Sequence, residues 1–131
     1  MTKFNFNDGG RQASGRKGTA GDCGVRAMAI ALNLPYDVCY KELAQANKDF
    51  GFTKSARNGI HKNVYEYVLR RHGWIWCKAP RIAGRKARCS DVPIKPAILR
   101  MAGHYSALRH DGIHDIWDCR DKMVYGYWAN P

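Results

Sequence analysis

The sequence predicts a single α+β domain in which three helices precede an antiparallel sheet. Apolar residues recur at helical spacing in three segments before residue 73, whereas short runs rich in β-branched and aromatic residues follow it. The chain has 131 residues, of which 45% are hydrophobic, so one domain with a real core is expected over residues 1–131.

The first predicted helix, Cys23–Leu32, is apolar on almost every side. This pattern is typical of a helix buried in the middle of a domain. Asp22 directly precedes the helix and is a residue type that commonly serves as N-cap. Cys23 is therefore expected in the first helical turn.

The other elements are predicted on both sides of this helix. Helical spacing indicates a second helix from Pro35 to near Gly51 and a third over Ile60–His72. Phe4–Phe6 alternates with polar residues like a short edge strand, and a glycine-rich basic loop follows over Arg11–Gly21. Strand-like character begins at Trp74–Cys77, and four short strands of an antiparallel sheet are predicted at Pro96–Arg100, His104–Leu108, Ile113–Asp118 and Met123–Trp128.

The chain is strongly basic, with a formal charge of +11. The segment Lys78–Arg100 holds seven basic residues against the single acidic residue Asp91, and therefore contributes +6 of that charge. A surface of this kind can bind nucleic acid or an acidic protein partner, although many charged surfaces are only solvated. The candidate nucleic-acid contacts are Arg85, Lys86 and Arg88.

Several classes of function are disfavoured by composition. The five cysteines form an odd set without C-x-x-C spacing, so we expect neither structural disulfides nor a metal site, and no motif suggests a cofactor. The longest apolar run, Ala27–Leu32, is far shorter than the roughly 20 residues of a membrane span. The N-terminus lacks the apolar stretch of a signal peptide, so a cytoplasmic protein is expected.

Cys23 is the residue that most clearly suggests chemistry. The dipole and free amides at a helix N-terminus favour a thiolate, which is the nucleophilic form of cysteine. The alternative is that Cys23 is simply a small buried hydrophobic residue, as many free cysteines are.

A base and an orienting carboxylate are predicted on the next hairpin. If His110–Gly112 forms a three-residue loop, His104 faces Asp118 across the hairpin, close enough for the carboxylate to orient the imidazole. A two-residue loop at residues 111–112 would instead pair His104 with Cys119 and weaken this arrangement. A nucleophile, a base and an orienter together follow the logic of a cysteine-dependent catalytic triad.

The chain resembles the papain-like cysteine peptidases through three short motifs, namely Gly21-Asp22-Cys23-Gly24, Gly103-His104-Tyr105 and the strand-end pair Trp117-Asp118. Within this group it resembles the small double-glycine peptidases, with their Asp-Cys-Gly, Gly-His-aromatic and strand-end Asp pattern. It also looks like a group of uncharacterised phage and bacterial papain-like proteins that share an Asp-Cys helix, a Gly-Trp-x-Trp strand and a terminal Val-Tyr-Gly-Tyr-Trp.

The resemblance implies a papain-like fold and a small cysteine hydrolase, whether peptidase, isopeptidase or amidase, that acts on a peptide or protein through a thioester. It implies Cys23 as nucleophile, His104 as general base and then acid, and Asp118 as orienter, with Asp115 in reserve. A basic, non-catalytic binding module on the same fold is the alternative.

One motif departs from the family pattern. The family places a glutamine side chain about six residues before the cysteine as an oxyanion donor. In this chain Lys17 occupies that position, and Gln12 lies five residues further upstream. Both are candidate oxyanion residues, beside the backbone amide of Cys23.

Overall fold

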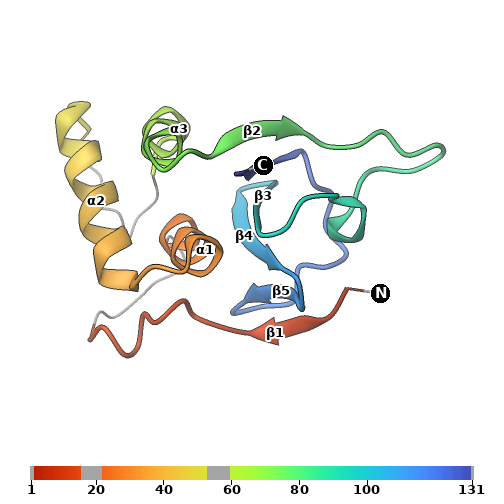
Figure 1. Cartoon of the computed structure of the whole chain (residues 1–131), viewed down its shortest axis with the longest axis horizontal. Coiled ribbons are helices and arrows are strands. Elements are labelled where there is room, and N and C mark those ends of the chain that lie inside the picture. Colours follow the sequence, from red (N-terminus) through yellow and green to blue (C-terminus); the bar gives the residue numbers. More distant parts are fainter. Residues whose placement is uncertain (1, 16–21, 53–59, 131) are drawn as a thin grey trace.

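The computed structural model of the chain describes residues 2–15, 22–52 and 60–130. These residues form three α-helices and a six-stranded mixed sheet, which confirms the predicted α+β class (Figure 1). The helices are α1 (Cys23–Leu32), α2 (Tyr36–Asp49) and α3 (Lys62–Arg71). The strands are β1 (Phe4–Phe6), β2 (Ile75–Lys78), β3 (Ala97–Met101), β4 (His104–Arg109), β5 (Gly112–Asp115) and β6 (Gly126–Ala129), with a short 3-10 helix, η2 (Cys89–Asp91), before β3.

The sheet is not purely antiparallel, contrary to the prediction. Its strand order is β1-β5-β4-β3-β6-β2, and β1 pairs in parallel with β5, so that Phe4 lies opposite Ile113. All other neighbours are antiparallel. A hairpin forces its two strands to be antiparallel, but no hairpin links β1 to β5, so the direction of β1 is left to packing.

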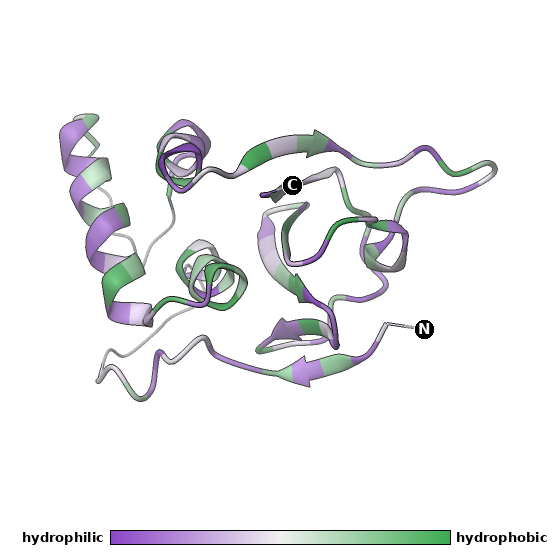
Figure 2. Ribbon diagram, viewed as in Figure 1, coloured by the Kyte–Doolittle hydropathy of each residue, from purple (hydrophilic) through white to green (hydrophobic). Residues whose placement is uncertain are grey.

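Both faces of the four central strands of the sheet are buried. Ile98, Tyr105 and Trp128 pack toward the helices, whereas their neighbours Leu99 and Tyr127 belong to a second apolar cluster on the opposite face. This alternation follows from the two-residue period of a strand. Figure 2 shows apolar residues on the strands and on α1, while much of α2 is polar.

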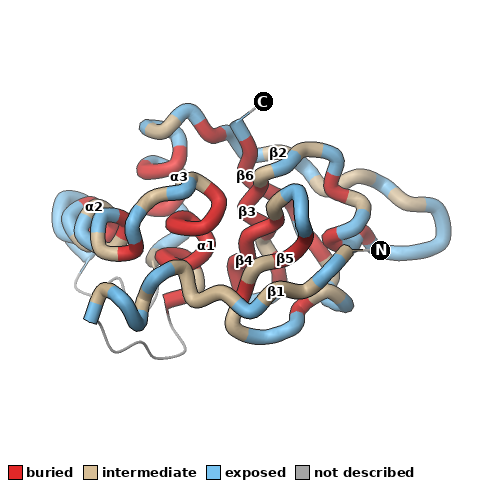
Figure 3. Tube along the Cα trace, turned by 60° about the horizontal axis from the view of Figure 1, so that its bottom comes forward, coloured by how far each residue is buried: buried red, intermediate tan, exposed pale blue. Residues whose placement is uncertain are grey.

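Helix α1 lies along β4. At its C-terminal end the Ile30 carbonyl accepts a hydrogen bond from Arg109 Nη1 at 2.7 Å, and Arg109 ends β4. Residues 24–31 of α1 are all buried, as the all-round apolar pattern predicts (Figure 3). The N-terminal end of α1 therefore lies near His104, where β4 begins.

The β4–β5 hairpin differs by one residue from the predicted register. Arg109 pairs with Gly112 around a turn at residues 110–111, and β5 ends at Asp115. Gly112 is a paired strand residue rather than part of the loop, and Lys3, which directly precedes β1, lies against it. A Cβ atom on Gly112 would come within 2.3 Å of the Lys3 carbonyl oxygen.

Among the described helices, none combines the length and apolar character that a membrane crossing requires.

The close approach of β1 to Gly112 gives a test of the mixed sheet. Gly112 has φ +122° and no room for a side chain, whereas Gly84 has φ +77° and open space around it. We expect Gly84→Ala to cost only the conformational penalty of about 1–2 kcal/mol, and Gly112→Ala to cost clearly more, measured as the free energy of unfolding in urea. Equal losses for the two variants would mean that β1 does not pack against this glycine.

Candidate active site

The Cys23 side chain lies at the start of α1 and is partly exposed. The first amides of a helix have no partner within the helix, and they favour a negative sulfur. Burial raises the pKa of the Cys23 thiol, but hydrogen bonds from the His104 side chain and the Tyr105 amide outweigh it. The charges of His104 and Arg26 act in the same direction, so the pKa of Cys23 lies below its ordinary value. The site favours a thiolate.

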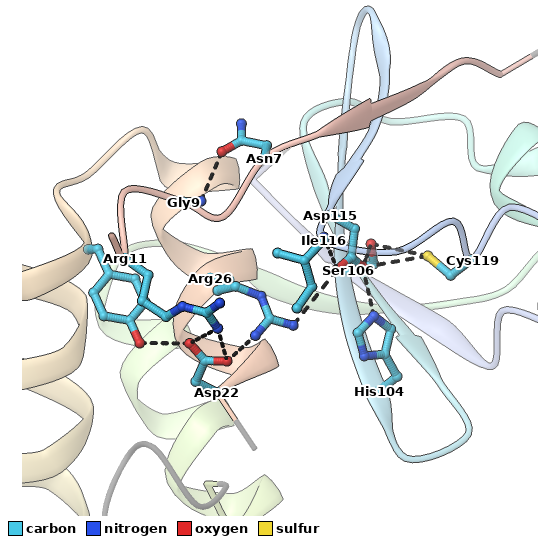
Figure 4. Close-up of polar contacts among 11 residues, drawn as sticks. Asn7, Gly9, Arg11, Asp22, Arg26, His104, Ser106, Asp115, Ile116 and Cys119 are labelled. Atoms are coloured by element: carbon cyan, nitrogen blue, oxygen red, sulfur yellow. Dashed lines mark hydrogen bonds and ion pairs between the residues drawn. The ribbon is translucent and has the colours of Figure 1, made fainter. Parts of the chain in front are cut away.

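His104 connects this thiol to a buried carboxylate. Its Nε2 donates a hydrogen bond to Oδ2 of Asp115 at 2.7 Å (Figure 4), which leaves Nδ1 as the nitrogen for Cys23. Burial lowers the pKa of His104, but hydrogen bonds, first of all with Asp115, raise it to about 11. The protonated imidazole and the Cys23 thiolate therefore stabilise one another.

Asp115, the residue held in reserve at the sequence level, is the carboxylate that contacts His104. Asp115 is 3% exposed and also accepts a hydrogen bond from Ser106 Oγ at 2.6 Å. Continuing the hairpin register by one pair beyond Ala107 and His114 places Ser106 opposite Asp115. Burial raises the pKa of Asp115, but the bonds from His104 and Ser106 lower it overall. Asp115 is thus an ionised orienter.

The prediction that Asp118 faces His104 is wrong for this structure. Asp118 lies beyond the end of β5, is exposed, and accepts hydrogen bonds from Arg120 at 2.7 and 2.8 Å. The error follows from the hairpin loop, because the shift of register and the early end of β5 leave Asp118 outside the sheet.

The two predicted oxyanion side chains do not complete the site in the described residues. Gln12 is exposed in a turn after β1, where its backbone amide donates to Asp8 at 3.1 Å. Lys17 lies outside the described residues. The amide of Cys23, at the first position of α1, is the donor that the described structure offers.

A buried ion-pair network joins α1 to the catalytic candidates. Asp22 is fully buried and makes no side-chain capping bond; instead, its carboxylate binds Arg26, Arg11 and the Tyr36 hydroxyl. The Arg26 guanidinium also lies 3.8 Å from Asp115, so that it bridges two carboxylates (Figure 4). The sequence signal for this network is an Asp and an Arg four residues apart at the start of an otherwise apolar helix.

Two further side chains enclose the histidine. Cys119 is fully buried, with its sulfur 3.4 Å from Ser106 Oγ and 3.6 Å from Asp115 Oδ2. The ring centroids of Trp117 and His104 lie 4.8 Å apart, and Trp117 is 40% exposed. One side of the imidazole is therefore shielded from water, which strengthens its bond to Asp115.

Within the described residues, one group of side chains brings possible metal-ligand atoms together, all within 4.8 Å of one another. The group consists of His104, Asp115 and Cys119. The direct bond of 2.7 Å between the His104 and Asp115 atoms is shorter than the separation expected for two ligands of one zinc ion with bonds of about 2.1 Å each. The arrangement is one of hydrogen-bonded partners.

The predicted nucleic-acid contacts are partly engaged within the protein. Arg85 makes two bonds to Asp91 at 2.6 and 2.9 Å, and Arg88 donates to the Asp121 carbonyl at 2.5 Å. The bond from Arg85 is the main reason that the pKa of Asp91 is lowered to about 2. Lys86 is exposed. Asp91 thus neutralises part of this patch.

No protein-family model, no curated protein and no solved structure matches this chain.

The Arg26 network should carry a large share of the stability. Removing one partner of a buried ion pair typically costs about 3–5 kcal/mol, whereas exposed pairs are worth about 0–1 kcal/mol. We expect Arg26→Met to lower the free energy of unfolding by about 3–5 kcal/mol. Arg70→Met, which breaks the exposed pair with Glu66, should lower it by about 0–1 kcal/mol. Similar losses for both variants would contradict the buried bridge.

The two candidate orienters can be separated by the reactivity of Cys23. We expect Asp115→Asn to slow alkylation of Cys23 by iodoacetamide at pH 7, because the imidazolium loses its carboxylate partner. Asp118→Asn should leave the rate unchanged. The rates are read by peptide mass spectrometry on folded protein, and the reverse order would restore Asp118 to the site.

Proposed function

We propose that this protein is a small papain-like cysteine hydrolase that cleaves an amide bond by means of Cys23, His104 and Asp115. The observation that carries the proposal is the 2.7 Å bond between His104 and Asp115 beside a helix-terminal cysteine with a lowered pKa. Nucleophile, proton carrier and orienter come from three different elements, as the general logic of a triad requires.

In the first half of the proposed reaction, the Cys23 sulfur attacks the carbonyl carbon of the substrate. A carbon–sulfur bond forms, and the carbonyl electrons move to oxygen, where the Cys23 amide stabilises the negative charge. His104 gives its Nδ1 proton to the leaving nitrogen as the carbon–nitrogen bond breaks. The products are a free amine and a thioester on Cys23.

In the second half, water replaces the amine. His104, now neutral, takes a proton from the water as it attacks the thioester carbonyl, and the carbon–sulfur bond breaks. A carboxylic acid leaves, and the thiolate and imidazolium are restored. Asp115 keeps Nε2 protonated throughout, so that Nδ1 alone exchanges the proton.

The function can be tested without knowing the substrate. A complex peptide mixture is incubated with wild-type protein, and new N-termini and deamidated side chains are quantified by mass spectrometry. New N-termini indicate a peptidase, and deamidation indicates an amidase. Both should vanish with Cys23→Ala and persist with Cys77→Ala, a control cysteine on β2. Equal product profiles for wild type and Cys23→Ala would overturn the proposal.

The pH dependence of alkylation gives a second test. An ordinary thiol gains reactivity by about tenfold per pH unit below its pKa near 8.5. Because the His104 side chain and the Tyr105 amide lower the pKa of Cys23, we expect its alkylation rate to level off at a lower pH than that of an ordinary thiol. His104→Ala should shift this levelling to higher pH. The same pH profile in wild type and in His104→Ala would contradict the interaction between the two side chains.

A further inference from the structure

A pocket of about 290 Å³ lies beside the candidate site, at residues of α3, β2, β3, β4 and β6 and the segment before β6. Four aromatic side chains line it, together with the charged residues Lys62, Glu66 and Arg100. The four aromatic residues are Trp76, Tyr105, Tyr125 and Trp128.

The pocket adjoins the nucleophile through Tyr105. The backbone amide of Tyr105 donates to the Cys23 sulfur, while its side chain lines the pocket. The Tyr65 ring lies 4.4 Å from the Tyr105 ring, and its hydroxyl donates to the Gly24 carbonyl at 2.8 Å. One layer of side chains therefore connects the pocket wall to the start of α1.

The aromatic residues divide into two buried and two exposed members. Tyr105 and Trp128 are 9% and 5% exposed, whereas Trp76 and Tyr125 are 39% and 47% exposed. The Trp76 and Trp128 rings meet edge to face at 5.4 Å. Large exposed aromatic side chains beside a hollow are typical of ligand-binding surfaces.

The charge at the pocket favours an anion. Arg100 donates to the Tyr105 hydroxyl at 2.8 Å and lies over its ring, and within the described residues it has no carboxylate partner. Glu66, the one acidic lining residue, is paired with Arg70. Lys62 adds a second cation.

We propose that this pocket binds an aromatic side chain of a peptide substrate, with an adjacent acidic residue held by Arg100. The inference rests on the proposed function, because it assigns the pocket to the substrate of Cys23. A peptide is favoured over nucleic acid because the walls form one compact pocket next to an acyl-transfer site, whereas nucleic acid needs a row of stacking platforms along a basic groove.

The Trp76 wall depends on Gly126. A Cβ atom at Gly126 would lie 2.2 Å from Cζ2 of Trp76, so the indole lies directly across this glycine. Gly126→Ala must therefore displace Trp76 and reshape the pocket without removing an aromatic residue. Ile75→Ala is a matched control, because Ile75 is an exposed neighbour on β2 that does not line the pocket.

Binding can be measured without catalysis in the Cys23→Ala variant. The probe is the blocked tetrapeptide Gly-Phe-Asp-Gly, and its binding is followed by quenching of the protein's tryptophan fluorescence. Two comparison peptides carry Phe-Asn or Ala-Asp at the central positions. A charge-assisted hydrogen bond is worth about 1.5–3 kcal/mol, so we expect binding of the Phe-Asp peptide to be about tenfold tighter or more than that of the Phe-Asn peptide. The Ala-Asp peptide should bind more weakly than either.

The variants assign this preference to the pocket. Adding Arg100→Gln should abolish the difference in affinity between the Phe-Asp and Phe-Asn peptides. Gly126→Ala should weaken the binding of both peptides, and Ile75→Ala should change the binding of neither.

Equal binding of all three peptides, or tight binding of a short oligothymidylate in their place, overturns the proposal. If the peptides bind as expected but wild-type protein cleaves nothing, the pocket stands and the hydrolase function fails. If cleavage occurs with no aromatic–acidic preference, the hydrolase stands and the pocket assignment fails.

Discussion

A chain of buried charges links helix α1 to the β4–β5 hairpin, and the candidate site depends on it. Arg26 lies between the carboxylates of Asp22 and Asp115, and Asp115 in turn holds His104. Isolated charges are expensive to bury, so each member is stable only while its partners remain in place. The network therefore fixes where α1 begins relative to the sheet.

The position of Cys23 follows from this constraint. The cysteine comes directly after Asp22, so anchoring Asp22 to Arg26 also sets the first turn of α1 beside the start of β4. His104 is then within reach of the sulfur on one side and of Asp115 on the other. A thiolate and an imidazolium can persist there because each lowers the cost of the other, and the carboxylate stabilises the cation.

Much of this arrangement could be predicted from the sequence, because helical periodicity is a strong local signal. It indicated all three helices, and it placed Cys23 at the first turn of a buried one. The sequence favours Asp118 over Asp115 only through a three-residue hairpin loop, and a hairpin register depends on a single loop residue that can be placed in more than one way. The position of Gly112 in the strand depends on β1, which lies far away in sequence. Such long-range packing leaves no local pattern, and the parallel pairing of β1 was missed for the same reason.

The protonation state of His104 tests the central claim most directly. With ¹⁵N-labelled histidine, the imidazole nitrogen shifts at pH 8 report whether the ring carries one proton or two. The thiolate–imidazolium pair supported by Asp115 predicts that both nitrogens of His104 are protonated at this pH. A neutral His104 ring at pH 8 would contradict the account.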